Sequence, residues 1–207
     1  MTALIFSLAP TQVTIAMDTL VTDTSGTPIG YTSKLFPLMH LDGIMCVTGL
    51  LNLATDWHAR LMRFVAKDMH HLDEFTTEQL QALWYQYEDQ VSFTSTVYHF
   101  GFSQQENQYL GYAYRSANNF VSERLPYAIG IKPPIHDVSI ETLPDFIDVM
   151  QRQRTIEDCK SSDERLYIGG EIQLAILENR CMSLTTVHRW EDYEEMYTTM
   201  CRQFPIA

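Results

Sequence analysis

The sequence predicts an α+β fold in which antiparallel strands and helices occupy separate stretches of the chain. Three observations carry this prediction: apolar residues alternate near the N-terminus, recur every three or four residues after Gly49, and return to strand-like runs from residue 92 onward. The expected order is strands, two helices, strands, a helix, strands and a helix, which is typical of sheets and helices in separate layers. A length of 207 residues suits one domain, 1–207, with a large core.

The first strands form an expected β-hairpin. Apolar residues alternate over 4–8 and again over 13–15, and the polar stretch 9–12 between them favours a turn. A second turn, rich in Gly, Ser and Pro, is expected over 24–28, followed by short strands over 34–37 and 43–48.

Two helices are expected next. Between Gly49 and Val65 the apolar residues follow helical spacing, and Asp73-Glu74-Phe75 is expected to interrupt the helical region. A capping-box pattern at Thr76–Gln79 then predicts the start of a second helix over 80–87.

The remaining elements follow the same reasoning. Strands are expected over 92–102, 108–114, 119–122 and 127–131, and a third helix over 142–158 with Pro144 in its first turn. Two strands over 166–177 and 181–188, joined by a tight turn, precede a last helix with an apolar face from Trp190 to Met200.

The charge of the chain excludes some partners. With 26 acidic against 14 basic residues the net charge is −12, which argues against nucleic acid and against an anionic membrane surface. The N-terminus has neither a signal-peptide pattern nor a long apolar run, so we expect a cytoplasmic protein with no membrane span.

The cysteines predict neither disulfides nor a metal site. Cys46, Cys159, Cys181 and Cys201 show no CxxC spacing and have no histidines at metal-ligand spacing. We therefore expect free, buried thiols in a reducing compartment, no metal and no cofactor.

Three evenly spaced residues suggest chemistry. If Met1 is removed, the hydroxyl of Thr2 can act as a nucleophile and its own α-amine as the base. A nearby lysine cation lowers the pKa of that amine, and a carboxylate holds the lysine in place. Lys34 and Asp18 are the candidates for these two roles.

The motifs around these residues resemble the proteasome β-subunit family of N-terminal-nucleophile hydrolases, in a divergent, bacterial-type form. They are Thr2, Ala16-Met17-Asp18, Lys34-Leu35-Phe36 and the strand that runs from Ile44 into Gly49. The resemblance implies a four-layer αββα sandwich and a threonine-type peptidase. It assigns catalytic roles to Thr2, Asp18 and Lys34, and it makes the backbone N–H of Gly49 the donor to the oxyanion.

The resemblance also implies a substrate pocket and partners. Val21, Thr32 and Val47 match the positions that line the family's pocket, and they favour an apolar or small side chain of a peptide or amide substrate. A homo-oligomeric ring is expected, with contacts from the helices that carry Trp57 and Trp84, and an ATP-driven unfoldase is a candidate partner.

The second half of the chain departs from the pattern of active members. The turn at Ile129–Lys132 lacks their serine, and Arg165 and Ile168 replace an aspartate and a serine, although Gly169-Gly170 is retained. Two alternatives therefore stay open beside the peptidase: a catalytically inactive structural or scaffold subunit, and an amidohydrolase of small amides. Each site residue also has an ordinary structural explanation, such as a turn-forming Asp18 or a solvated Lys34.

Overall fold

The computed structural model describes residues 2–87 and 93–203, and its strands form two five-stranded antiparallel sheets and one two-stranded sheet. The first sheet has the order β10-β1-β2-β11-β12: β10 (Ile129–Lys132), β1 (Leu4–Leu8), β2 (Gln12–Asp18), β11 (Glu171–Glu178) and β12 (Cys181–Arg189). The second has the order β5-β6-β7-β8-β9: β5 (Leu35–Leu38), β6 (Gly43–Thr48), β7 (Thr96–Ser103), β8 (Gln108–Arg115) and β9 (Ser122–Arg124). The small sheet pairs β3 (Leu20–Thr22) with β4 (Pro28–Tyr31).

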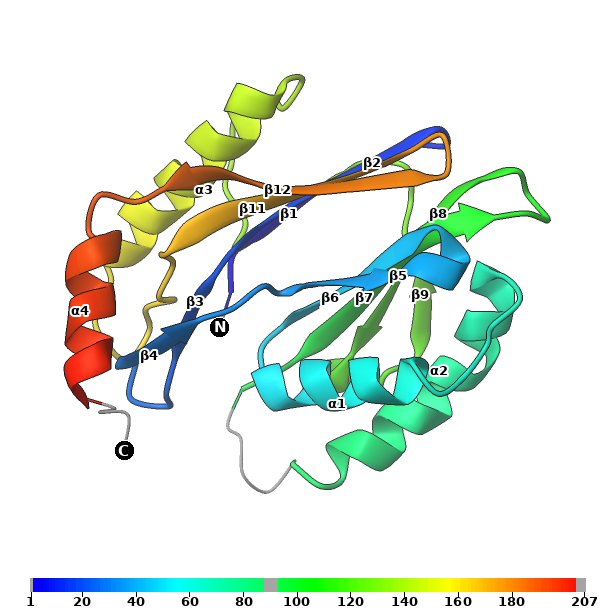
Figure 1. The fold of residues 1–207 in the computed structure, drawn as a ribbon, viewed down its shortest axis with the longest axis horizontal. Coiled ribbons are helices and arrows are strands. Elements are labelled where there is room, and N and C mark those ends of the chain that lie inside the picture. Colours follow the sequence, from blue (N-terminus) through cyan, green and yellow to red (C-terminus); the bar gives the residue numbers. More distant parts are fainter. Residues whose placement is uncertain (1, 88–92, 204–207) are drawn as a thin grey trace.

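Helices cover the outer faces of the two large sheets, which lie face to face (Figure 1). The helices are α1 (Leu51–Leu61), α2 (Met69–Trp84), α3 (Leu143–Asp158) and α4 (Tyr193–Gln203), with short 3-10 helices at Met39–Leu41 and Ser116–Asn118. Helices α1 and α2 pack on the β6–β8 sheet, α3 packs on the β1–β11 sheet, and α4 stands beside β4 (Figure 1).

Three apolar clusters hold these layers together. One lies between the first two helices and their sheet around the fully buried Trp57. The second fills the space between the sheets and includes Leu4 and Phe100, and the third joins the first sheet to α3 around Phe146. Burial of this apolar surface is the main term that favours the fold.

The alternation along β1 directs the start of the chain into the space between the sheets. Leu4, Phe6 and Leu8 belong to the inter-sheet cluster, whereas Ala3 and Ile5 face the α3 side. Because side chains of a strand alternate with a period of two, this pattern places the residue before Ala3 on the inter-sheet side as well.

The expected boundaries of the first two helices were wrong. Helix α1 ends at Leu61, and α2 begins at Met69, so the interruption expected at Asp73–Phe75 lies inside a helix. The start signal is Asp68, whose side chain accepts a hydrogen bond from the His70 N–H at 3.2 Å. Thr76, expected at a cap, lies within the helix and donates its hydroxyl to the Leu72 carbonyl at 2.6 Å.

Several strands also differ from the expected ranges. Strand β11 begins at Glu171, five residues after the expected 166, and β9 covers Ser122–Arg124 because Asn119 and Phe120 adopt left-handed conformations with φ of 57° and 55°. The strand expected over 92–102 corresponds to β7, which covers Thr96–Ser103, and residue 92 lies outside the described residues. The strands β3 and β4, which flank the expected turn at 24–28, were not predicted.

The cysteines are free but mostly not buried, which corrects the expectation. Cys46 is buried in the inter-sheet cluster, where desolvation raises the pKa of its thiol. Cys159 after α3, Cys181 at the start of β12 and Cys201 on α4 are exposed.

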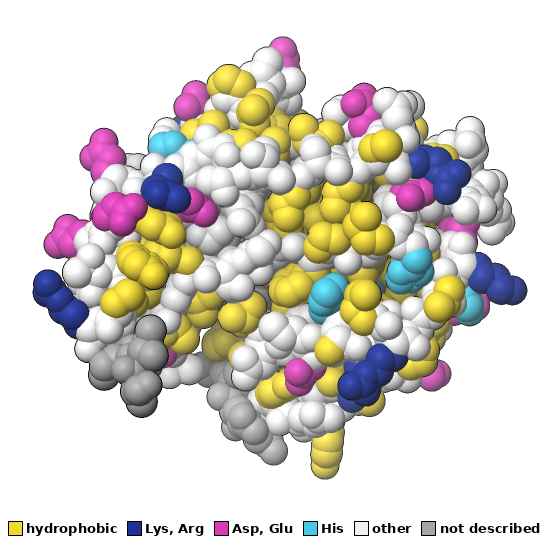
Figure 2. All heavy atoms as spheres, viewed as in Figure 1, with side chains coloured by type: hydrophobic (Ala, Val, Ile, Leu, Met, Phe, Trp, Pro, Cys, Tyr) yellow, Lys and Arg dark blue, Asp and Glu magenta, His cyan; other side chains and the backbone are white. Residues whose placement is uncertain are grey.

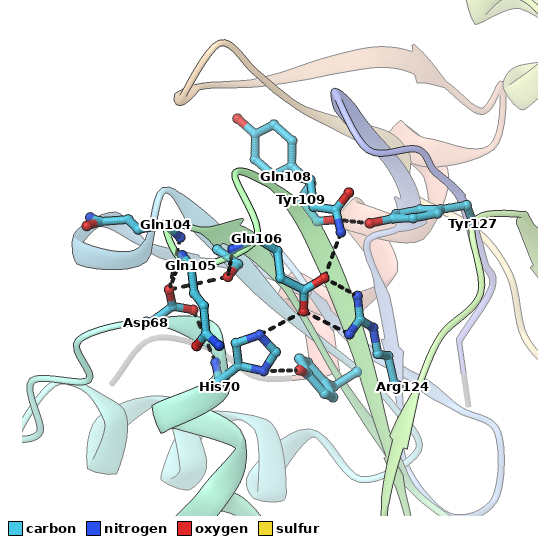
Figure 3. Close-up of polar contacts among 11 residues, drawn as sticks. Asp68, His70, Gln104, Gln105, Glu106, Gln108, Tyr109, Arg124 and Tyr127 are labelled. Carbon is cyan, nitrogen blue, oxygen red and sulfur yellow. Dashed lines mark hydrogen bonds and ion pairs between the residues drawn. The ribbon is translucent and has the colours of Figure 1, made fainter.

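A polar network fixes the start of α2 to the hairpin of β7 and β8 (Figure 3). Glu106 in the hairpin turn accepts two hydrogen bonds from Arg124 of β9, at 2.8 and 2.7 Å, and lies 2.8 Å from the His70 ring. Asp68 accepts hydrogen bonds from the Gln104 and Gln105 N–H groups at 2.9 and 3.2 Å. The hairpin and the helix are thereby joined at one end of the second sheet.

Candidate active site

Thr2 lies at one end of the inter-sheet space and lines a pocket of about 210 Å³. Only 6% of its surface is exposed, although it lies near the start of the described chain. The pocket opens between the surface over β3 and β4 and the surface over the start of α1 (Figure 2).

Lys34 and Asp18 form a buried ion pair beside this pocket. The Lys34 ammonium donates to Asp18 Oδ2 at 3.0 Å and to the Leu20 carbonyl at 2.7 Å, and the two side chains are 6% and 0% exposed. Burial lowers the pKa of Lys34, and the carboxylate of Asp18 opposes that shift. The lysine is therefore neither solvated nor at a surface edge.

Asp18 also fixes the backbone next to Thr2. Its Oδ1 accepts a hydrogen bond from the Ala3 N–H at 3.0 Å, while Oδ2, besides binding Lys34, lies 3.5 Å from the donating Gly169 N–H. Asp18 therefore holds the start of β1 and Lys34 with different oxygens. Its position at the end of β2, which pairs with both β1 and β11, makes these contacts geometrically accessible.

Gly49 follows β6 and lines the same pocket as Thr2. Its φ of 110° is a conformation that side chains disfavour, and an added Cβ would lie 2.8 Å from both the Cα of Ser95 and the carbonyl oxygen of Thr94. The glycine thus allows a turn in which the backbone, rather than a side chain, faces the pocket.

The expected pocket residues are only partly brought together. Val21, at the β3–β4 sheet, and Val47, on β6, both line the pocket. Thr32 is absent from the described lining; its N–H donates to the Thr19 carbonyl at 2.9 Å, which continues the β3–β4 pairing. The backbone pairing after β4 fixes the place of Thr32, and its role in substrate binding stays a prediction.

Other lining residues had no signal in the sequence. Ile29, Leu50, Leu51 and Phe93 complete apolar parts of the wall. Ser95 lies behind Gly49 and accepts a hydrogen bond from the Leu50 N–H at 3.0 Å. These residues come from β4, from the start of α1 and from the segment before β7, so no single periodic pattern groups them.

Arg165 and Ile168, at the positions where the sequence departs from the expected motif, make contacts outside the Thr2 pocket. Arg165 forms an ion pair with Asp158 at 2.5 Å and stacks on Tyr167, and Ile168 is buried in the apolar cluster against α3. Neither side chain is among the described residues that line the Thr2 pocket.

Comparisons with known proteins assign no family. A scan against protein-family models found no match, and a search of curated protein sequences found no significant match. Within residues 2–87 and 93–203, no three His, Cys, Asp or Glu side chains gather as a metal site would require. In the same described parts of the chain, no helix combines the length and apolar character needed to cross a membrane.

Proposed function

We propose that this chain is a threonine-type hydrolase of peptide or amide bonds with the αββα N-terminal-nucleophile architecture, acting through Thr2 after removal of Met1. One observation carries the proposal: Thr2, Lys34 and Gly49 line one pocket, and Asp18 binds both Lys34 and the backbone next to Thr2. Residues far apart in sequence thus supply a nucleophile, a tuning cation and a backbone donor at one place.

The proposed reaction proceeds through an ester. The Thr2 hydroxyl attacks the carbonyl carbon of the amide while the free α-amine of Thr2 accepts its proton. The C–N bond then breaks, the leaving amine takes up that proton, and the acyl group remains on Thr2 until water hydrolyses the ester. The Gly49 N–H would donate to the oxyanion formed in each addition step.

In the proposed mechanism, the buried pair of Lys34 and Asp18 places a positive charge near the α-amine of Thr2. An α-amine has an ordinary pKa of about 7.7–8.0, and a neighbouring cation lowers it, so more of the amine is neutral and able to accept a proton. Asp18 favours the charged form of Lys34 against the cost of burial. A solvated lysine would exert much less influence, because water screens its charge.

The pocket suggests the kind of side chain that the substrate carries. Val21, Val47 and Ile29 make its walls largely apolar, and about 210 Å³ is enough for a medium-sized apolar side chain. A panel that compares peptides with small amides of the same acyl group separates a peptidase from an amidohydrolase of small amides.

The first test is the state of residue 1 in protein from its native host. Intact-mass spectrometry should give the mass without Met1, and a retained methionine would refute an active Thr2. Hydrolysis of short apolar peptides should then be lost in Thr2→Ala and partly kept in Thr2→Ser, which retains the hydroxyl. Equal activity in Thr2→Ala and the parent chain would exclude Thr2 as the nucleophile.

A second candidate function is that of a catalytically inactive, proteasome-like scaffold subunit. The contacts of Arg165 and Ile168 favour it, because the positions that carry polar groups in active members are here engaged with Asp158 and the apolar core. This alternative predicts an assembled protein with Met1 removed or retained and with no hydrolysis of any peptide in the panel.

Both candidates include a ring of identical subunits. Trp57 on α1 is fully buried against its own sheet, whereas Met62, Phe64 and Val65 after α1 are 64%, 47% and 82% exposed. We propose that these three residues contribute to the contact. Light scattering should give a multiple of 23.9 kDa, and a monomer at micromolar concentration would refute the ring and its use by an unfoldase.

A further inference from the structure

A second cavity, of about 270 Å³, lies between the two large sheets at the edge formed by β10. Leu4, Phe6, Tyr98 and Leu125 supply its walls, and Lys132 and Arg115 supply its cations. It shares no described lining residue with the pocket at Thr2.

Lys132 lines this cavity from the edge strand β10. It pairs with Leu4 across the β1–β10 ladder, and its ammonium donates to the Thr48 and Thr96 hydroxyls of the facing sheet, at 2.7 and 3.4 Å. Both hydroxyls are buried, with the two threonines 1% and 3% exposed. The amine therefore spans the gap between the sheets instead of extending into solvent.

The charge of Lys132 has no carboxylate partner among the residues that the structure describes. Lys34 and Lys160 pair with Asp18 and Glu157, and Arg115 pairs with Glu123 at 2.9 Å. Within residues 2–87 and 93–203, Lys132 contacts only neutral oxygens, and both burial and the nearby Arg115 lower its pKa. In a chain with 26 acidic residues, a partly buried lysine that has no carboxylate partner is an unusual arrangement.

We propose that this cavity binds a small monocarboxylate with a compact apolar body, its carboxylate paired with Lys132. A carboxylate there would remove the unfavourable burial of an unpaired cation, and the apolar walls would take up the rest of the ligand. The size of the cavity suits a short aryl or branched acid rather than a long-chain fatty acid.

The binding is tested with 3-phenylpropionate as the probe, by NMR titration of the ¹⁵N-labelled full chain. We expect saturable shifts at the amides of Gly130 and Ile131, which line the cavity. The neutral 3-phenylpropionamide should bind at least about tenfold more weakly, which corresponds to about 1.4 kcal/mol. N-acetylphenylalanine, a mimic of a peptide C-terminus, shows whether the acid comes from a peptide end or from a free small acid.

Variants locate the charge that matters. Lys132→Met should weaken binding of 3-phenylpropionate at least about tenfold, whereas Lys67→Met, which removes an exposed lysine elsewhere, should leave it unchanged. Equal binding of acid and amide to the parent chain, or no saturable shift at Gly130 and Ile131, would overturn the proposal. The readout is binding, so it does not depend on whether Thr2 is catalytic.

Discussion

Replacing Lys34 with methionine should both destabilise this protein and remove any hydrolysis. Methionine is close to lysine in size, so the substitution mainly deletes the ammonium. It leaves the Asp18 carboxylate, with no exposed surface, without its cation, and it leaves the Leu20 carbonyl without a donor. Breaking a buried ion pair by removing one partner typically costs about 3–5 kcal/mol.

The double variant separates the charge from the packing. In Asp18→Asn/Lys34→Met no charge remains in the buried site, and the asparagine oxygen can still accept the Ala3 N–H bond that Asp18 accepts at 3.0 Å. We therefore expect the double variant to recover most of the stability lost in Lys34→Met, because replacing a whole buried pair with neutral groups is often nearly neutral.

Urea unfolding measures both effects. At an m-value of about 2 kcal/mol/M, a loss of about 4 kcal/mol lowers the midpoint by about 2 M. A loss below about 1 kcal/mol, the size typical of an exposed pair, would refute the burial argument. A folded double variant that still hydrolyses peptides at the parent rate would refute the tuning role of Lys34.

Three further predictions follow from other parts of the structure. Gly49→Ala should lower the free energy of unfolding by about 1–3 kcal/mol and abolish hydrolysis, because the φ of 110° at residue 49 and the close Ser95 backbone both oppose a side chain. Urea unfolding and a peptide assay measure the two effects, and a variant with unchanged stability and activity would contradict the prediction. Val47→Phe should narrow the pocket at Thr2, so hydrolysis of peptides with large apolar side chains should fall more than that of peptides with alanine, and a parallel loss would mean that Val47 does not set specificity. Pairing with Arg124 lowers the pKa of Glu106 to about 2, so the stability that the Glu106 carboxylate contributes is present above the unfolded pKa and is lost as the pH falls through about 2. The difference in urea midpoint between the parent chain and Glu106→Gln should therefore vanish toward pH 2. A difference that stays constant with pH would exclude the charge of Glu106 as its cause.

The sequence predicts the order of strands and helices better than it predicts the element boundaries. The expectation that Thr2, Asp18 and Lys34 meet came from the resemblance of their motifs to a known family. In the structure Lys34 donates to Asp18 at 3.0 Å, and Asp18 also accepts the Ala3 N–H. The helix start at Met69 was missed because a polar stretch containing Asp73 resembled a break. Tertiary packing of Leu72 overrides that local signal.

Long-range contacts limit what spacing can reveal about the pocket. Thr32 was expected in the wall, but its backbone continues the β3–β4 ladder, whereas Phe93 and Leu50 reach the pocket from other segments. The sequence likewise gave the residue types of Arg165 and Ile168 but not the directions of their side chains. Only the packed structure shows that both side chains are engaged with the α3 side of the first sheet.

The buried pair of Lys34 and Asp18 is also an argument about function. A subunit that needs only its fold and its contacts gains little from a buried lysine, since apolar residues of similar volume are often equally stable or more so. The cost is easier to understand where the charge acts on a neighbouring group, and here Asp18, which binds Lys34 with one oxygen, holds the Ala3 N–H beside Thr2 with the other. If the scaffold alternative is correct, Asp18→Asn/Lys34→Met should assemble like the parent chain and lose no activity, because there is none to lose. If the hydrolase proposal is correct, that double variant should fold and assemble but turn over no peptide.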